Sequence, residues 1–71
     1  MKIKKGTIVK VKEPKWGDYI GIARTDFDTE DEWYAIAVHQ EKPVYGISKI
    51  WNNGDEIPCR NGLNAIEVME V

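Results

Sequence analysis

Short runs in which apolar and polar residues alternate recur along the chain. Residues 7–12 (TIVKVK) alternate valine with lysine, and residues 19–24 (YIGIAR) place two isoleucines on one face. A period of two residues is typical of a β-strand with one buried face. Residues 33–39 (WYAIAVH) are apolar on both faces, which indicates an interior strand. The pattern therefore predicts three strands before residue 40.

The second half of the chain is organised around a turn. An apolar, β-rich run covers residues 44–51, and a shorter run covers residues 56–60. Between them lies the sequence Asn-Asn-Gly-Asp. These residue types tolerate the positive φ angles that tight β-hairpin turns require. We therefore expect a hairpin whose two strands are these runs, with Gly54 at positive φ.

The chain ends in another alternating run, residues 65–71 (AIEVMEV), which predicts a last strand. A short helix over residues 63–70 is the alternative, but β-branched residues weigh against it. Five or six short antiparallel strands predict an all-β fold with a single domain over residues 1–71. At this length a small barrel is the arrangement that leaves no strand edge exposed. The residues expected in the core are Val9, Val11, Ile20, Ile22, Tyr34, Ile36, Val38, Ile47, Ile57, Ile66 and Val68.

The composition is that of an ordinary globular domain, with 42% hydrophobic and 31% charged residues. The single cysteine, Cys59, has no partner within the chain for a disulfide and fits a reducing compartment. No apolar run approaches the roughly 18 residues that a membrane span needs. The basic N-terminal segment lacks the apolar stretch of a signal peptide. We therefore expect a cytoplasmic protein that does not insert into a membrane.

The net charge of −2 conceals a split between the two parts of the chain. Residues 1–24 contain seven cationic and two acidic side chains, a net charge of +5. Residues 25–71 contain three cationic and ten acidic side chains, a net charge of −7. The net charge thus does not indicate a strongly charged partner such as a nucleic acid. A local surface patch of either sign is still an alternative.

Basic residues lie close to aromatic residues in the first part of the chain, and this combination is typical of nucleic-acid surfaces. The alternative is that strand lysines face water and protect an exposed edge from aggregation. The residues of the nucleic-acid hypothesis are Lys4, Lys5, Lys10, Lys12, Lys15 and Trp16.

An acidic segment, residues 25–32 (TDFDTEDE), places carboxylates at alternate positions, as in a calcium-binding loop. The match then fails, because the sixth position is Asp31 instead of glycine and the twelfth is Ala37 instead of glutamate. We therefore expect a solvated loop that binds no metal. Its carboxylates could steer a basic partner: Asp28, Glu30, Asp31 and Glu32.

The residues that usually carry out catalysis are scarce. The one histidine, His39, has no cysteine or histidine at ligand spacing, and Cys59 lacks a CxxC partner. Ser48 is the one serine, and no glycine-rich phosphate loop occurs. General acid–base or nucleophilic catalysis therefore has little to draw on, and we expect no enzyme activity and no cofactor.

Aromatic residues are numerous for 71 positions. One or two are needed to fill a small core, whereas exposed tryptophan and tyrosine are favoured anchors in protein interfaces. Trp16 lies in a loop with proline and glycine and is expected to be exposed, and Trp51 closes the predicted hairpin. The predicted contact residues for a protein partner are Trp16, Tyr19, Tyr45 and Trp51.

Three segments together resemble SH3-like barrels of the non-signalling kind. They are the opening residues 5–11 (KGTIVKV), residues 21–23 (GIA) and the closing residues 66–70 (IEVME). KOW domains of ribosomal and transcription proteins and the ferredoxin-docking subunit of photosystem I share this pattern. The resemblance implies an SH3-like barrel and, through KOW domains, the possibility of nucleic-acid binding. Residues 57–61 (IPCRN) are similar to a motif of signalling SH3 domains, but that class's Ala-Leu-Tyr-Asp-Tyr opening is missing, so polyproline binding is not implied.

The leading hypothesis is thus a small non-catalytic protein-interaction module. It could be an accessory subunit or a small inhibitor, including one encoded by a phage. A KOW-like nucleic-acid-binding domain is the alternative.

Overall fold

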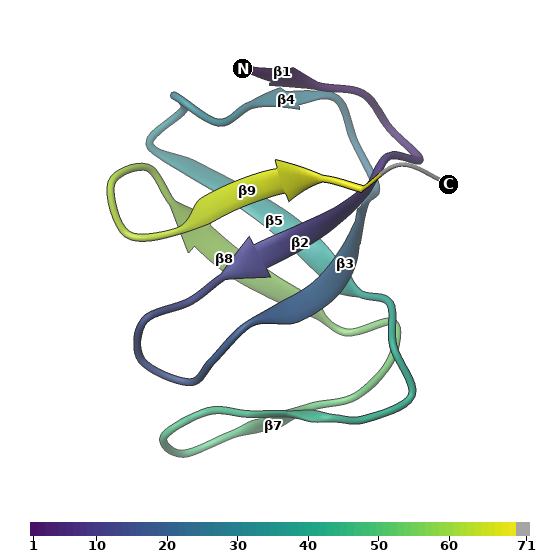
Figure 1. The fold of residues 1–71 in the computed structure, drawn as a ribbon, viewed down its shortest axis with the longest axis vertical. Coiled ribbons are helices and arrows are strands. Elements are labelled where there is room, and N and C mark those ends of the chain that lie inside the picture. The colour runs from purple at the N-terminus through teal and green to yellow at the C-terminus, as the bar shows by residue number, and fades with distance from the viewer. Residues whose placement is uncertain (70–71) are drawn as a thin grey trace.

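Antiparallel β-structure accounts for every regular element of the computed structural model, which describes residues 1–69 (Figure 1). Five strands form the main sheet, in the spatial order β8-β5-β3-β2-β9. Along the chain β2, β3, β5 and β8 pair in succession, and the last strand, β9, returns to pair with β2. Their bounds are β2 (Ile8–Lys12), β3 (Tyr19–Ala23), β5 (Trp33–Val38), β8 (Glu56–Arg60) and β9 (Ala65–Val68).

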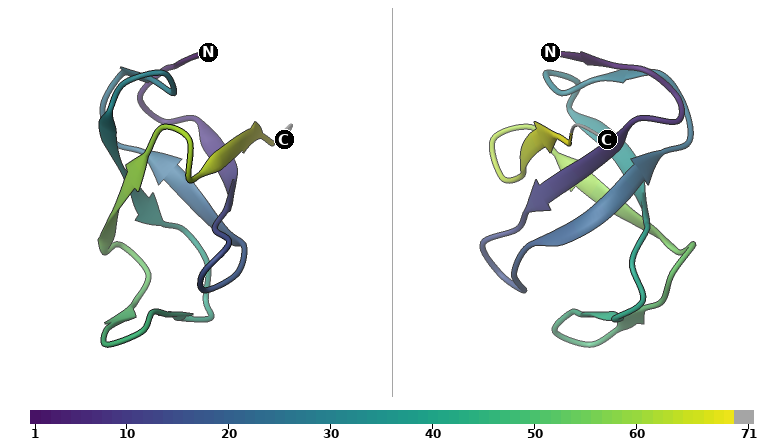
Figure 2. Two further views of the ribbon diagram at one scale, coloured as in Figure 1. Left: turned by 90° about the vertical axis from the view of Figure 1, so that its left-hand side faces the viewer. Right: turned by 45° about the vertical axis from the view of Figure 1, so that its right-hand side comes forward.

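Two short ribbons accompany the main sheet. One joins β1 (Lys2–Ile3) to β4 (Phe27–Asp28), and the other joins β6 (Val44–Tyr45) to β7 (Ile50–Trp51). Figure 1 places these ribbons at opposite ends of the molecule, and both rotated views in Figure 2 keep them apart.

The prediction of an all-β, antiparallel fold is confirmed. No helix occurs in the described part of the chain, residues 1–69. The predicted closure is not found among the strands of this part, because β8 and β9 lie at the two edges of the main sheet without pairing to each other. Within the same residues, no helix long and apolar enough to cross a membrane is found.

The core lies on the inward faces of β2, β5 and β8, as the alternation of their sequences predicts. Six of the expected core residues are buried: Val9, Val11, Tyr34, Ile36, Val38 and Ile57.

The inward face of β3 was predicted wrongly. Ile20 and Ile22 are only half-buried, and the alternate residues of the strand are buried instead: Tyr19, Gly21 and Ala23. The register explains this, because Tyr19 pairs with Val11 and directly opposed residues share one face of a sheet. Gly21 also leaves room for Ile36 on the neighbouring strand, since a Cβ at Gly21 would lie 2.2 Å from the Cγ2 of Ile36.

The run of residues 44–51 was predicted as one strand but is a complete hairpin, β6 and β7 with a turn between them. Consequently β8 pairs with β5 and not with this run. The expected φ of Gly54 is confirmed at 93°, but its turn joins the hairpin to β8. Ile47, predicted in the core, is 84% exposed at the hairpin turn.

Two further segments depart from prediction. The acidic segment is not wholly a solvated loop, because Phe27 stacks on Tyr34 with ring centroids 4.6 Å apart. Val68, expected in the core, is exposed on the edge strand β9, whereas Ile66 is half-buried against the core. Residues 70 and 71 of the predicted last strand lie outside the described residues.

Candidate functional site

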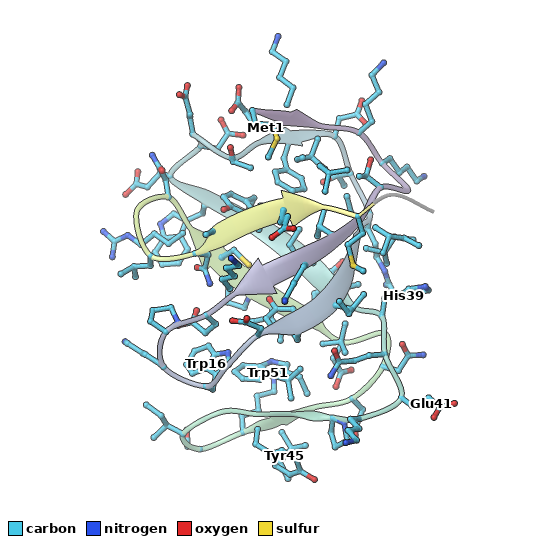
Figure 3. The ribbon with its side chains drawn as sticks, viewed as in Figure 1. Met1, Trp16, His39, Glu41, Tyr45 and Trp51 are labelled. Carbon is cyan, nitrogen blue, oxygen red and sulfur yellow. The ribbon has the colours of Figure 1, made fainter. Side chains whose placement is uncertain are left out.

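The hairpin formed by β6 and β7 has two faces of different character. Its register pairs Val44 with Trp51 and Tyr45 with Ile50, so each pair shares one face. Val44 is buried and Trp51 is half-buried, whereas Tyr45 and Ile50 are exposed. Figure 3 shows Trp51 and Tyr45 on opposite sides of the hairpin ribbon. One face therefore packs on the body of the protein, and the other points away from it.

The inner face is anchored by a pair of tryptophans. The ring of Trp51 packs against that of Trp16, with centroids 5.3 Å apart and planes inclined by 39°, and both rings contact the core. Gly46 is what lets Trp51 lie flat on the hairpin, because a Cβ there would be 2.4 Å from the indole ring. The Gly46 amide also donates a hydrogen bond of 2.8 Å to the carbonyl of Lys49, which closes the turn.

Tyr45 and Ile50 share the outer face of the hairpin, and Ile47 lies in the turn that joins its strands. Together these three residues are the apolar surface of interest, which we call the outer face. These side chains are 64%, 84% and 53% exposed. Single exposed apolar residues are common, but three neighbours on one protruding ribbon form a patch of the kind that marks interaction sites.

The structure brings together three of the four aromatic residues predicted to contact a partner. Tyr45 lies on the outer face, and the rings of Trp16 and Trp51 lie on the other side, between the hairpin and the main sheet (Figure 3). The expected exposure of Trp16 is wrong, because its side chain is half-buried. Its indole nitrogen is buried too, without a hydrogen-bond partner among the described residues. The two tryptophans thus support the surface rather than form it.

Tyr19, the fourth predicted contact residue, has no surface to offer, being only 2% exposed. Its hydroxyl shares a hydrogen bond of 3.5 Å with the thiol of Cys59. Burial raises the pKa of both groups, which keeps them protonated. Tyr19 and Cys59 are therefore parts of the core.

The acidic residues lie at the other end of the molecule from the hairpin, beside the β1–β4 ribbon (Figure 1). Asp28 accepts hydrogen bonds from the Glu30 amide at 3.0 Å and from the N-terminal ammonium group at 3.2 Å. These bonds hold the pKa of Asp28 below its usual range. Glu30, Asp31 and Glu32 are exposed. Because of this separation, the acidic segment and the outer face cannot form one continuous contact surface.

The lysines of the nucleic-acid hypothesis divide into two groups. Lys10 and Lys12 point outward from β2, where they lie 4.0 Å from Asp18 and 3.8 Å from Glu67. Neighbouring carboxylates thus offset their charge. The remaining lysines are exposed: Lys4, Lys5 and Lys15.

Ile47 and Ile50 belong to the outer face but were not predicted as site residues. The apolar run 44–51 was taken for a single strand, which assigned Ile47 to the core. A signal was present, since Gly46 and Ser48 interrupt the run with residue types that favour turns.

A scan against protein-family models and searches of curated proteins and of solved structures found no match to this chain. The geometry of the site therefore carries the functional argument.

Proposed function

We propose that this chain is a small, non-catalytic protein-interaction module, acting as an accessory subunit or as a small inhibitor. The observation that carries the proposal is the outer face of the hairpin, where Tyr45, Ile47 and Ile50 are each more than half exposed. Covering such side chains on binding removes apolar surface from water, which contributes roughly 25 cal/mol per Å² before the costs of association.

The support beneath this face favours the same function. An isolated two-stranded hairpin is at best marginally stable in water. Here Trp51 and Val44 attach the hairpin to the core, and Trp16 holds Trp51 from the adjacent loop. A contact surface that is ordered before binding loses less conformational entropy when a partner docks.

We also propose that the main sheet is an SH3-like framework. Its strand order supports this, because four successive antiparallel strands are followed by a last strand that returns beside the first. In this assignment the candidate hairpin lies in the long connection between the third and fourth strands of the main sheet, β5 and β8. Small barrels of this kind serve many unrelated functions, so the fold itself does not identify the partner.

Site-specific photocrosslinking in the cell of origin tests the function. A photoreactive amino acid at Ile47 should yield a discrete crosslinked product with another protein. The matched control is the same substitution at Leu63, an exposed apolar residue of the β8–β9 turn that lies outside the hairpin. Crosslinks of equal yield from both positions, or from Leu63 alone, would contradict the proposal.

The nucleic-acid alternative has weaker support. Two of its lysines are paired with carboxylates, and Trp16 packs on Trp51 instead of presenting a free face for stacking. Titration with single- and double-stranded oligonucleotides at two salt concentrations discriminates the functions, because phosphate contacts lose affinity steeply with salt. Salt-sensitive binding that Lys4→Glu and Lys5→Glu abolish would favour the alternative.

A further inference from the structure

We propose that the outer face of the hairpin binds a protein segment in which apolar side chains are interspersed with carboxylates. This inference rests on the proposed function and adds the chemistry of the partner. The apolar part of that chemistry follows from Tyr45, Ile47 and Ile50. The acidic part follows from the charges of the hairpin region.

The hairpin is positively charged, although it belongs to the acidic part of the chain. Residues 25–71 carry a net charge of −7 but contain two lysines, Lys42 and Lys49. Both belong to the hairpin region, and no carboxylate occurs from residue 42 to residue 54. Lys42 lies two residues before β6, and Lys49 immediately precedes β7. The two strands that carry the apolar face thus each follow a lysine.

These lysines are available to a partner. Both are exposed, and neither is within ion-pair distance of a carboxylate among the described residues. Lys10 and Lys12 on β2, by contrast, have carboxylates nearby. The ammonium group of Lys49 lies 5.9 Å from the ring centroid of Trp51, so its charge lies toward the packed side of the hairpin, next to the outer face and not on it. Both charges thus belong to the hairpin but flank its outer face, where carboxylates at the edge of a docked partner would meet them.

The charges also argue against pairing of two hairpins in a symmetric dimer. A two-fold contact would bring the lysines of one copy toward those of the other, and like charges in an interface are unfavourable. A partner whose carboxylates flank apolar residues would match both the apolar side chains of the face and the lysines of the hairpin. Apolar contact would supply most of the affinity, and the ion pairs would select the partner, since exposed ion pairs each contribute little.

Binding of three short synthetic peptides tests the proposal, with backbone amide resonances of the ¹⁵N-labelled protein as the readout. The first peptide combines leucine and phenylalanine with glutamate and aspartate. The second keeps its apolar residues but replaces every acid with lysine, and the third keeps the acids but replaces every apolar residue with serine. The first should shift resonances of residues 44–51, and its affinity should fall as salt is added. The other two should bind at least tenfold more weakly at this face.

Charge reversal supplies the matched pair of variants. Lys42→Glu with Lys49→Glu should weaken binding of the first peptide about tenfold. Lys2→Glu with Lys4→Glu, at the opposite end of the molecule, should leave it unchanged. Since all four lysines are exposed, both variants should retain a wild-type pattern of dispersed resonances outside the changed regions.

The outcomes separate this inference from the proposed function. Equal or tighter binding of the lysine peptide at residues 44–51 would overturn the acidic partner and leave the interaction module in place. The same holds if anionic phospholipid vesicles shift these resonances at lower concentration than the first peptide does, because the ligand would then be a lipid surface. If no peptide shifts the hairpin, the acidic partner is overturned, and photocrosslinking at Ile47 decides the function independently.

Discussion

The main sheet buries the isoleucine of an apolar run, whereas the β6–β7 hairpin exposes the isoleucine of a similar run. Ile36 on β5 is fully buried, whereas Ile47 in the hairpin turn is 84% exposed. Both isoleucines lie in apolar, β-rich runs. The difference is that β5 has a strand on each side and a core beneath it. In the part of the chain that the structure describes, the hairpin has only its own two strands and one packed face. An apolar run thus indicates a strand but not what will cover it.

The two regions also differ in what holds them in place. The sheet is stabilised by the burial of side chains from many strands, so its stability is distributed over many contacts. The hairpin depends on a few contacts: the Val44–Trp51 and Tyr45–Ile50 pairs, the Gly46 turn and the contact of Trp51 with Trp16. Substitutions in the sheet should therefore change global stability, and substitutions in the hairpin should change mainly local order.

The largest effect is expected at Ile36. Ile36→Ala should lower the free energy of unfolding by about 2–5 kcal/mol, because it leaves a cavity in the core. Ile47→Ala should change it by less than about 0.5 kcal/mol, since the side chain is exposed. Urea denaturation of both variants measures the difference. Similar losses from the two substitutions would mean that the sheet and the hairpin are not distinct in packing.

A somewhat smaller loss of stability is expected when a methyl group is added next to Ile36 instead of being removed from it. Gly21→Ala introduces a Cβ that would lie 2.2 Å from the Cγ2 of Ile36. Overpacking of this kind costs about 1–3 kcal/mol. In the double variant with Ile36→Ala the contact with Cγ2 disappears and the 3.0 Å approach to the Ala37 carbonyl oxygen remains, so the combined loss should be smaller than the sum of the two single losses. Strict additivity in urea denaturation would contradict the close contact between β3 and β5.

Gly54, at the junction of hairpin and sheet, should rank next. Its φ of 93° is strained for a β-branched residue, and the nearest atom to an added Cβ is 3.7 Å away. The cost of Gly54→Val therefore arises from the backbone, about 1–3 kcal/mol. Lys49→Ala should cost less than about 0.5 kcal/mol. Thermal unfolding of the two variants provides the comparison, and equal melting temperatures would contradict it.

Gly46→Ala should act locally. The added methyl group would displace the ring of Trp51 and so disturb its contact with Trp16, whereas the core of the main sheet stays intact. Near-ultraviolet circular dichroism should change strongly in the tryptophan region, while the far-ultraviolet spectrum should not. Gly62→Ala is the control for the tryptophan signal: it strains a turn through the backbone, at a φ of 88°, but apart from its chain neighbours its added Cβ has no atom within 4 Å, so the tryptophan region should stay unchanged. An unchanged tryptophan signal in Gly46→Ala would mean that Trp51 is not held as described.

The smallest change, and one of opposite sign, is expected at Tyr34. Its hydroxyl is buried without a hydrogen-bond partner among the described residues, so Tyr34→Phe should leave stability unchanged or raise it by up to about 1 kcal/mol at neutral pH.

Alkaline pH should enlarge this difference. Burial raises the pKa of Tyr34 to about 12, above its value of about 10 in an unfolded chain. The stability that the neutral hydroxyl maintains is therefore fully present below about pH 10 and is lost as the pH rises toward about 12. Denaturation midpoints of the two proteins should diverge above about pH 10, in favour of phenylalanine. Parallel curves up to about pH 12 would contradict the burial of this hydroxyl.

Much of the β-structure could be predicted from the sequence by itself, because the signals are local. Alternation identified the strands near residues 7–12 and 19–24, a continuous apolar run identified the strand near residues 33–39, and the run 56–60 coincides with β8. The positive φ of Gly54 also followed from its neighbours in the chain. Each of these features depends on residues only a few positions apart.

Only the tertiary structure decided the features that depend on distant residues. Tyr19, and not Ile20, points inward because β3 pairs in register with β2. Trp16 is half-buried because Trp51, far along the chain, packs against it. Ile47 is exposed because, within residues 1–69, no other strand pairs with its hairpin. A period of two residues describes both faces of a strand equally well, and only pairing and packing across the fold select the face that is buried.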